Sequence, residues 1–424
     1  MHRRNPRFPK RQRGAVAVVV GLAIFVLVGM IGLALDSGQL FVNKTELQNA
    51  ADACALAAAR ELDGSSDALA RADAVGEMVG KQNMAGFQGM AIEFLPGDIR
   101  YSEQLGPNTD AYYRTSEFAD PAKAKFAMCR VQRAHVHMWF MGLFGYNDPK
   151  KTPGVSAYAV ATLAPAQTSC ALPIGFCRNN GAPLEGCDNP DKYGLCVGDW
   201  RNGKFEAGGG SYGAFNWIDF EDKAGGTPEL SELLITGKCD VSDVGEVKFS
   251  EPGVKKDADK AWNSRFGLYF PGGGAGNPSA TGEPPAAPDW TGFSYTPTNW
   301  LKAGDSVPRN AFGDFLAHRL INDSYQGDEE TGLKLPPSYT TSNTPGADRR
   351  VVPVPMIDCD AWAPSKVVEI LDWACVLMLH PIGNPSKDDV YMEYRGLAST
   401  PGSPCASYGL AGGTIGPLVP VLVQ

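Results

Sequence analysis

The segment GAVAVVVGLAIFVLVGMIGLAL, residues 14–35, runs for 22 positions without a charged side chain. As a helix it would be about 33 Å long, enough to cross a hydrocarbon core of roughly 30 Å. A cluster of cations with no acid among them precedes it: Arg3, Arg4, Arg7, Lys10, Arg11 and Arg13. Because clustered cations stay on the cytoplasmic side of a membrane, we expect residues 1–13 to form a cytoplasmic tip.

The expected architecture is a single-pass protein of a bacterial inner membrane, with its N-terminus cytoplasmic and its bulk periplasmic or facing the surface. The transmembrane helix would include Gly14, Leu22, Phe25 and Leu35 as membrane-anchor residues. A cleaved signal peptide is the alternative, since Gly32-Leu33-Ala34 has the small-x-small pattern of a cleavage site. The apolar run is longer than the usual h-region of about 7–15 residues, so we favour a retained anchor.

The composition limits the class of protein. The chain has 424 residues, which suggests two or three units, and it is 43% hydrophobic, which is enough for a sizeable core. Most of the 49 glycines and 32 prolines follow residue 90 and predict short strands and many loops. Six of the 38 cations lie in the tip, so the rest of the chain has 32 cations against 47 acids. An acidic body of this kind disfavours nucleic acid as a partner.

The segment DSGQLFVNKTELQNAADACALAAARELDG, residues 36–64, predicts a helix that follows the membrane span closely. Asp36-Ser37-Gly38 is expected to interrupt the helix at the membrane surface. One helical face would then carry Leu40, Leu47, Ala51, Cys54, Ala58 and Leu62. Gly64 would end the helix, and a second helix to about Gln82 would complete a hairpin. Its small side chains suit close docking of another helix or of a sheet.

The remaining chain predicts strands and loops. Residues 91–103 predict a strand pair around a Pro-Gly-Asp turn, and residues 124–140 and 155–165 predict further strands. These strands would add a small sheet to the hairpin, giving a module over 36–165. Further on, the expected strands are residues 215–220, 244–249, 350–359, 367–382 and 389–396. A Pro/Gly-rich mobile loop is expected near 271–299. The predicted fold class is α+β: an N-terminal transmembrane helix, a membrane-proximal helical hairpin with a small sheet, and a β-rich, disulfide-containing outer region over 166–424.

All ten cysteines lie beyond the apolar run, which favours disulfides in an oxidising compartment: Cys54, Cys129, Cys170, Cys177, Cys187, Cys196, Cys239, Cys359, Cys375 and Cys405. Four of them fall within residues 170–196, where a zinc site is the alternative, but they lack the short C-x2–4-C spacing of zinc ribbons. Connectivity does not follow from the sequence, although local pairs within this cluster are the simplest guess. For Cys54 we weigh a tie to the outer domain, with Cys129 as its candidate partner, against a plain buried thiol.

Four motifs with potential chemistry have simpler structural explanations. Gly209-Gly210-Ser211-Tyr212-Gly213 matches the hydrolase pattern G-x-S-x-G but lacks the strand before it and the helix after it. His135 and His137 would share a strand face without a third metal ligand. Asp188-Asn189-Pro190-Asp191, with Asp199, lacks the order of a calcium loop. Asp63-Gly64-Ser65-Ser66-Asp67 is only superficially similar to the metal site of von Willebrand A domains. We predict no enzyme activity, no cofactor and no metal.

The N-terminal third resembles the TadE/TadG-like components of the tight-adherence (Tad, Flp-type) pilus machinery. The resemblance rests on Arg13-Gly14, the span, the Asp36-x-Gly38 motif and the block from Leu47 to Ala59, with Cys54 where the family usually has alanine. It is clear over about residues 10–65 and weaker to about 165. The matching motif residues are Asp36, Gly38, Leu47, Gln48, Ala50, Ala51, Asp52 and Leu56.

The resemblance implies a structural or assembly role in a Tad-like pilus or secretion apparatus. The implied partners are the lipid bilayer and other pilus or secretion components. Pilin-like members usually carry a glutamate five residues after the cleavage-site glycine, but this position is Val19 here, which leaves processing at Gly14 and entry into the filament open. An anchored surface adhesin or binding module is the alternative function, and an anchored hydrolase using Ser211 a remote one.

Overall fold

The computed structural model of the protein describes residues 13–133, 135–136, 138–141, 154–204, 206–207, 215–220, 226–241, 243–250, 253–254, 258–269, 291–301, 307–329, 331, 340–341, 349–361, 367–383 and 389–424. The chain divides into two compact units. Unit 1 comprises Met1–Leu163 with Pro420–Gln424, and unit 2 comprises Ala164–Val419. The last residues of the chain therefore return to the first unit, which the sequence did not predict.

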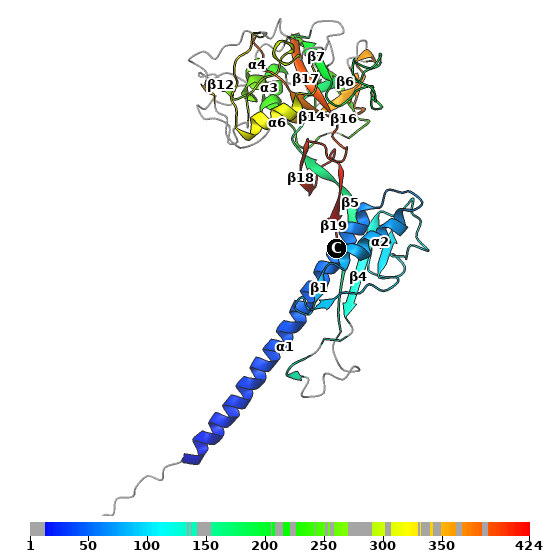
Figure 1. Ribbon diagram of the computed structural model, residues 1–424, viewed down its shortest axis with the longest axis vertical. Coiled ribbons are helices and arrows are strands. Elements are labelled where there is room, and N and C mark those ends of the chain that lie inside the picture. Colours follow the sequence, from blue (N-terminus) through cyan, green and yellow to red (C-terminus); the bar gives the residue numbers. More distant parts are fainter. Residues whose placement is uncertain are drawn as a thin grey trace, which may run out of the picture. The chain divides into compact units, whose positions relative to one another are not determined.

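One uninterrupted helix, α1 (Arg13–Arg60), is the longest element of unit 1 (Figure 1). Its 48 residues correspond to a length of about 72 Å. The predicted interruption at Asp36-Ser37-Gly38 is wrong. The segment contains no proline, and one glycine costs a helix only about 1 kcal/mol relative to alanine.

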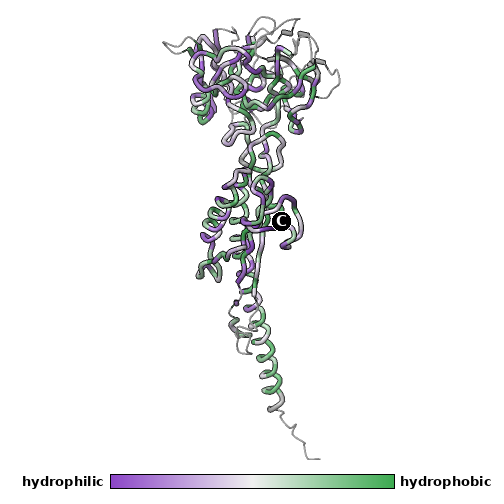
Figure 2. The backbone as a smooth tube through the Cα atoms, turned by 90° about the vertical axis from the view of Figure 1, so that its right-hand side faces the viewer, coloured by the Kyte–Doolittle hydropathy of each residue, from purple (hydrophilic) through white to green (hydrophobic). Residues whose placement is uncertain are grey.

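The two halves of α1 have different surfaces. Up to Leu35 its described side chains are apolar and almost all exposed, and this half is green in the hydropathy view of Figure 2. In the described part of the chain, α1 is the one helix long and apolar enough to cross a membrane. From Asp36 onward the helix becomes polar and small-sided and packs against the rest of unit 1.

The rest of unit 1 is a second helix with short antiparallel strands. The elements are α2 (Ala68–Gly80), β1 (Met84–Ala85), β2 (Met90–Ala91), β3 (Ile99–Ser102), β4 (Phe126–Arg133) and the first part of β5 (Val155–Thr168). Strand β4 lies between β3 and β5, with Cys129 opposite both Ile99 and Ala159. The C-terminus adds to β5, because Val160 exchanges backbone hydrogen bonds with Val423 and Gln424 of 2.7–2.8 Å.

Small side chains let α1 pack closely against the sheet and α2. The fully buried face of α1 consists of Ala50, Ala51, Cys54, Ala55, Ala58 and Ala59, and the facing sheet supplies Ala127, Cys129, Ala157, Ala159 and Ala161. On α2, a Cβ atom added at Gly76 would lie 3.2 Å from the Cβ of Ala58, and one at Gly80 equally close to the Cβ of Cys54. The predicted hairpin is therefore present, and its two helices meet through glycine and alanine.

A disulfide joins Cys54 of α1 to Cys129 of β4, with the two Cα atoms 6.0 Å apart. Cys129 was the candidate partner suggested by the sequence, and the pairing is confirmed. The expected role of the bond is corrected, however, because it ties the helix to the sheet inside unit 1 rather than to an outer domain. The plain buried thiol is excluded for Cys54.

Unit 2 contains an eight-stranded sheet with strand order β15-β10-β9-β6-β14-β16-β17-β7. These strands are β6 (Ile174–Cys177), β7 (Trp200–Lys204), β9 (Phe215–Asp219), β10 (Val247–Ser250), β14 (Val351–Ile357), β15 (Val367–Glu369), β16 (Asp372–Met378) and β17 (Asp389–Leu397). The other strands of unit 2 are β8 (Glu206–Ala207), β11 (Gly253–Val254), β12 (Leu268–Tyr269), β13 (Thr340–Thr341) and β18 (Ala406–Ala411). The last strand, β19 (Leu418–Leu422), begins in unit 2, ends in unit 1 and pairs with β5. The helices are α3 (Gly226–Thr236), α4 (Ala258–Ser264), α5 (Pro297–Trp300) and α6 (Phe312–Leu320).

Both faces of the central strands are covered, which explains why β14 is buried at every position. On one face Val354 and Val376 pack with α3 and with Trp262 of α4. On the other face Val351 and Leu377 pack with α6. The strands predicted at 350–359 and 389–396 are confirmed, as is the α+β class. The single strand predicted over 367–382 is wrong, because the segment divides into β15 at the edge of the sheet and β16 beside β14. Of the loop predicted near 271–299, residues 271–290 lie outside the described residues, and the last residues begin α5 with a capping box between Thr296 and Asn299.

The other eight cysteines form four disulfides in unit 2: Cys170–Cys239, Cys177–Cys359, Cys187–Cys196 and Cys375–Cys405. The expectation of local pairs is right only for Cys187–Cys196. The zinc alternative is wrong, because each of the four clustered sulfurs is in a disulfide, and these belong to three different bonds. The longest link, Cys177–Cys359, spans 182 residues and joins β6 to a residue just after its parallel neighbour β14.

The tight packing of α1 yields a stability prediction. Ala58→Leu adds volume where α2 offers only Gly76, so we expect unit 1 to lose about 1–3 kcal/mol of unfolding free energy. Ala57→Leu is the matched control, since Ala57 is only half-buried on the same helix turn. Pulse proteolysis in urea, with unit 1 fragments quantified, measures both. Equal midpoints for the two variants would contradict close packing at this face.

Candidate functional site: the membrane-proximal junction of unit 1

A buried carboxylate marks the point where α1 stops being apolar. Asp36 is 2% exposed and accepts hydrogen bonds from three successive backbone N–H groups. Trp139 donates to Oδ1 at 2.8 Å, Met141 donates to Oδ2 at 2.6 Å, and Phe140 lies 3.1–3.2 Å from both oxygens. Charge-assisted bonds of this kind are stronger than neutral ones, so Asp36 fixes a segment about a hundred residues away against the helix.

Gly32 makes room for this segment one turn below Asp36. A Cβ atom added at Gly32 would lie 2.7 Å from Cγ of Phe140, closer than such atoms approach. The phenyl ring therefore packs directly on the helix backbone. Gly32, the first small residue of the Gly32-Leu33-Ala34 pattern, thus has a packing role in the folded chain.

A second acidic side chain of α1 holds the turn between β1 and β2. Glu46 is 8% exposed, and its carboxylate accepts from the backbone N–H of Phe87 at 3.2 Å and of Gln88 at 3.1 Å. Phe87 and Gln88 have φ values of 61° and 60°. Non-glycine residues seldom adopt this left-handed region and pay for it in conformational energy. Glu46 offsets that cost and keeps the turn against the helix.

Polar side chains on α1 hold the ends of β4 and β5 as well. Arg133 at the end of β4 donates to Oδ1 of Asn43 at 2.5 Å, and Gln48 donates to the carbonyl of Tyr158 at 3.0 Å. Lys44 donates to the carbonyl of Ser156. Together with Asp36 and Glu46, these residues dock four separate segments along the part of α1 that follows the apolar half.

The residues of the predicted family motif divide between this polar edge and the buried face. Asp36 and Gln48 bind other segments, and Asp52 accepts from Gln48 at 2.8 Å. Leu47, Ala50 and Ala51 are buried, Leu56 is partly buried, and Gly38 has open space beside it. The whole set lies on one helix that ends at Arg60.

Residues 14–61 match the Tad family model of TadE/G-like Flp pilus assembly. The N-terminal region of this chain is TadE/G-like. The match starts one residue after α1 begins and ends one residue after it ends, so the Tad region and α1 are the same element. A search of curated proteins and a search of solved structures each return no match.

The acidic segment after the Tad helix forms no metal site of the von Willebrand type. Its carboxylates surround the guanidinium of Arg71, which lies 2.6 Å from Asp63 and 3.1 Å from Glu61 and also pairs with Asp67. The bond from Arg71 is the main cause that lowers the pKa of Asp67 to about 2, and bonds from Ser65 lower the pKa of Asp63. Asp67 precedes α2 but makes no side-chain cap.

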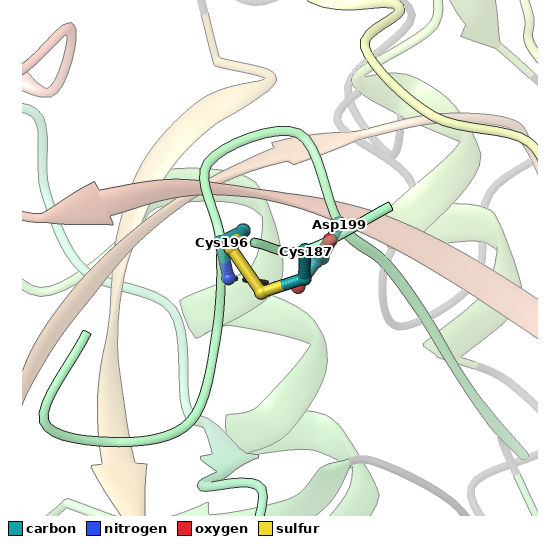
Figure 3. A group of neighbouring side chains, drawn as sticks. All are labelled: Cys187, Cys196 and Asp199. Carbon is teal, nitrogen blue, oxygen red and sulfur yellow. Dashed lines mark hydrogen bonds between the residues drawn. A yellow bond between two sulfur atoms is a disulfide. The ribbon is translucent and has the colours of Figure 1, made fainter. Parts of the chain in front are cut away.

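The acidic residues of the candidate calcium motif, Asp191 and Asp199, form hydrogen bonds and an ion pair within the fold. Asp199 is fully buried beside the Cys187–Cys196 disulfide (Figure 3), where it pairs with Arg309 at 2.7 Å and accepts from the N–H of Cys196. The two sulfurs of this group are bonded to each other and offer no thiolate to a metal. Asp191 accepts from two backbone amides of its own turn and from the hydroxyl of Tyr394. Burial raises the pKa of Tyr394.

Two predicted candidates fall outside the described residues. Ser211 and His137 both lie there, so the hydrolase motif and the two-histidine motif have no described geometry. Sequence reasoning missed Gly32 and Glu46 as docking residues, and it missed the role of 139–141. The available signal was the apolar cluster Met138 to Phe140 directly after a strand, and the glycines that flank Phe87-Gln88.

The Asp36 contact predicts a local change in hydrogen exchange. In Asp36→Asn the side chain keeps one acceptor oxygen and loses its charge, so the amides of 139–141 lose partners. We expect their free energy of local opening to fall by about 1–3 kcal/mol while α1 stays helical. Exchange measured by mass spectrometry on the full chain in detergent micelles tests this.

Asp52→Asn is the matched control, because Asp52 lies on the same helix and its described hydrogen bond is to Gln48 alone. It should leave exchange at 139–141 unchanged. If the amides of 139–141 are equally protected from exchange in Asp36→Asn and in Asp52→Asn, Asp36 does not hold the segment.

Proposed function

We propose that this chain is a membrane-anchored envelope protein with a structural or assembly role in a Tad/Flp-like pilus or secretion apparatus. The observation that carries the proposal is the coincidence of the Tad match with α1. That helix joins an apolar, exposed half to a half that organises unit 1. A continuous helix transmits position from the bilayer to the folded part without a hinge, as a structural component requires.

The proposed orientation has the N-terminal tip in the cytoplasm and both units outside the inner membrane, in the periplasm or at the surface. The cations of residues 1–13 support this orientation. The five disulfides support it independently, because such bonds persist in oxidising compartments. The proposed partners are the lipid bilayer and other pilus or secretion components, and we propose no catalytic activity.

An anchored adhesin or binding module is the second candidate, and one feature of unit 2 favours it. Beside α5 and α6 an open cavity of about 550 Å³ combines the aromatic rings of Phe293 and Trp300 with the carboxylates of Asp314, Asp328 and Glu329. Aromatic faces with a few convergent polar groups are typical of small-ligand sites. In this alternative, unit 2 would bind a surface or ligand without any pilus.

Gene deletion distinguishes the two candidates. For the assembly role we expect a deletion strain to lose surface pili and pilus-dependent adherence, and the wild-type gene to restore both. Electron microscopy of surface pili is the measurement. Normal piliation with reduced surface binding would instead support the adhesin.

A replaced anchor tests whether membrane attachment itself is needed. When residues 1–35 are exchanged for a cleaved signal peptide, units 1 and 2 are secreted without the span, and we expect pili to remain absent. An exchange for an unrelated single span of the same length and orientation is the control and should restore at least part of the piliation. Full piliation by the released form would contradict an anchored role.

A further inference from the structure

We propose that Phe87, Trp139 and Phe140 form an aromatic foot that seats unit 1 in the headgroup layer of the bilayer. Trp139 is 53% exposed and Phe87 is 56% exposed although both are large apolar side chains. Their rings stack with centroids 6.4 Å apart and planes 9° from parallel, so they act as one surface. The proposal rests on α1 crossing the membrane, and it does not depend on a role in pili.

The depth of the foot follows from its attachment to α1. Leu35 ends the apolar run, and Asp36 holds the backbone of Trp139 beside it. A bilayer is about 40–45 Å thick with headgroups and about 30 Å without them, so each headgroup layer spans roughly three to five helical residues. Because Asp36 is the first residue of that layer on the outer side, the segment bound to it lies in the same layer.

The second ring of the foot comes from the β1–β2 turn, which is docked at Glu46, ten residues beyond Asp36 on α1, and the ring joins the foot by stacking on Trp139. Met84 and Met90 flank Phe87 on the turn and are exposed too. The left-handed backbone at Phe87 and Gln88, held by Glu46, directs the phenyl ring toward Trp139. The costly turn conformation thus has a function, since it brings a second ring to the membrane surface. Figure 1 shows β1 beside α1, beyond the midpoint of the helix toward the rest of unit 1.

Lipid is the occupant that fits this surface, because it is continuous with the lipid-facing half of α1. Phe140 packs on Gly32, inside the apolar run, and Trp139 is the next residue outward. Tryptophan is enriched where hydrocarbon meets headgroups, since its ring is apolar while its N–H seeks a polar partner. One helix alone leaves unit 1 free to tilt and rotate, and a contact off the helix axis restrains both motions.

Tryptophan fluorescence tests the foot directly. Trp139 is the one tryptophan before residue 200, and the other seven lie from Trp200 to Trp373. The full chain is reconstituted into vesicles of phosphatidylcholine, with plain or with brominated acyl chains that quench on contact. We expect brominated lipid to remove an emission component that corresponds to one of eight tryptophans, and this component to be absent from Trp139→Phe.

A matched pair of charge substitutions tests the second ring. Phe87→Asp should reduce the quenching of Trp139, because a carboxylate draws the turn out of the layer. Phe118→Asp is the control: Phe118 is also exposed in unit 1, at 72%, but lies on a different turn and should leave quenching unchanged. Formation of the Cys54–Cys129 disulfide, read by mass spectrometry without reductant, verifies that each variant folds.

The outcomes separate the foot from the anchor. Vesicle flotation measures the insertion of α1 into the bilayer. A chain that does not float with the vesicles would contradict both the membrane anchor and the aromatic foot. A chain that floats while Trp139→Phe and wild type are quenched equally by brominated lipid overturns the foot alone and leaves the anchor and the pilus role standing. Shielding of Trp139 from both brominated lipid and aqueous iodide would also overturn it, since protein would then cover the ring.

Discussion

The close approach of α1 to its neighbours is the constraint on which unit 1 depends. The helix presents alanine where it meets the sheet, and α2 presents glycine where it meets α1. Small residues gain little from burying area, but they allow backbones to approach closely enough for many weak contacts. The Cys54–Cys129 bond lies in the middle of this face, where only such packing brings helix and strand within disulfide reach.

Local patterns in the sequence were enough for the helices of unit 1 and for β3, β4 and β5. They were not enough for the β1–β2 hairpin, because a strand pair within 91–103 was expected instead. The span, the small-sided face and the strands around Cys129 each follow from periodicity within a dozen residues or so. The contacts that organise these elements were not predictable in the same way. Asp36 and Trp139 are 103 residues apart, and Glu46 and Phe87 are 41 apart, so neither pair leaves a periodic signal. The predicted break at Asp36 failed for a different reason, because the segment has no proline and one glycine costs a helix little.

In unit 2, the contacts that could not be predicted from local sequence patterns are the disulfide pairings. The core strands were recognisable as apolar β-branched runs, because both faces of the sheet are covered. The presence of disulfides was also predicted, but their pairing was not, since loop-closure entropy favours local pairs only in an unstructured chain. Once β6 and β14 lie side by side in the sheet, Cys177 and Cys359 become neighbours in space despite their separation along the chain.

The carboxylate of Asp36 illustrates how two unfavourable groups stabilise each other at the end of the apolar run of α1. A charged side chain next to lipid is costly unless it is paired or hydrogen-bonded. Backbone amides outside a helix or sheet are also costly when they are buried without a hydrogen-bond partner. The carboxylate of Asp36 accepts the hydrogen bonds that the amides of 139–141 donate, and neither group would be favourable there without the other. The apolar run ends at the residue before Asp36, so this mutual requirement fixes where along α1 the folded unit begins.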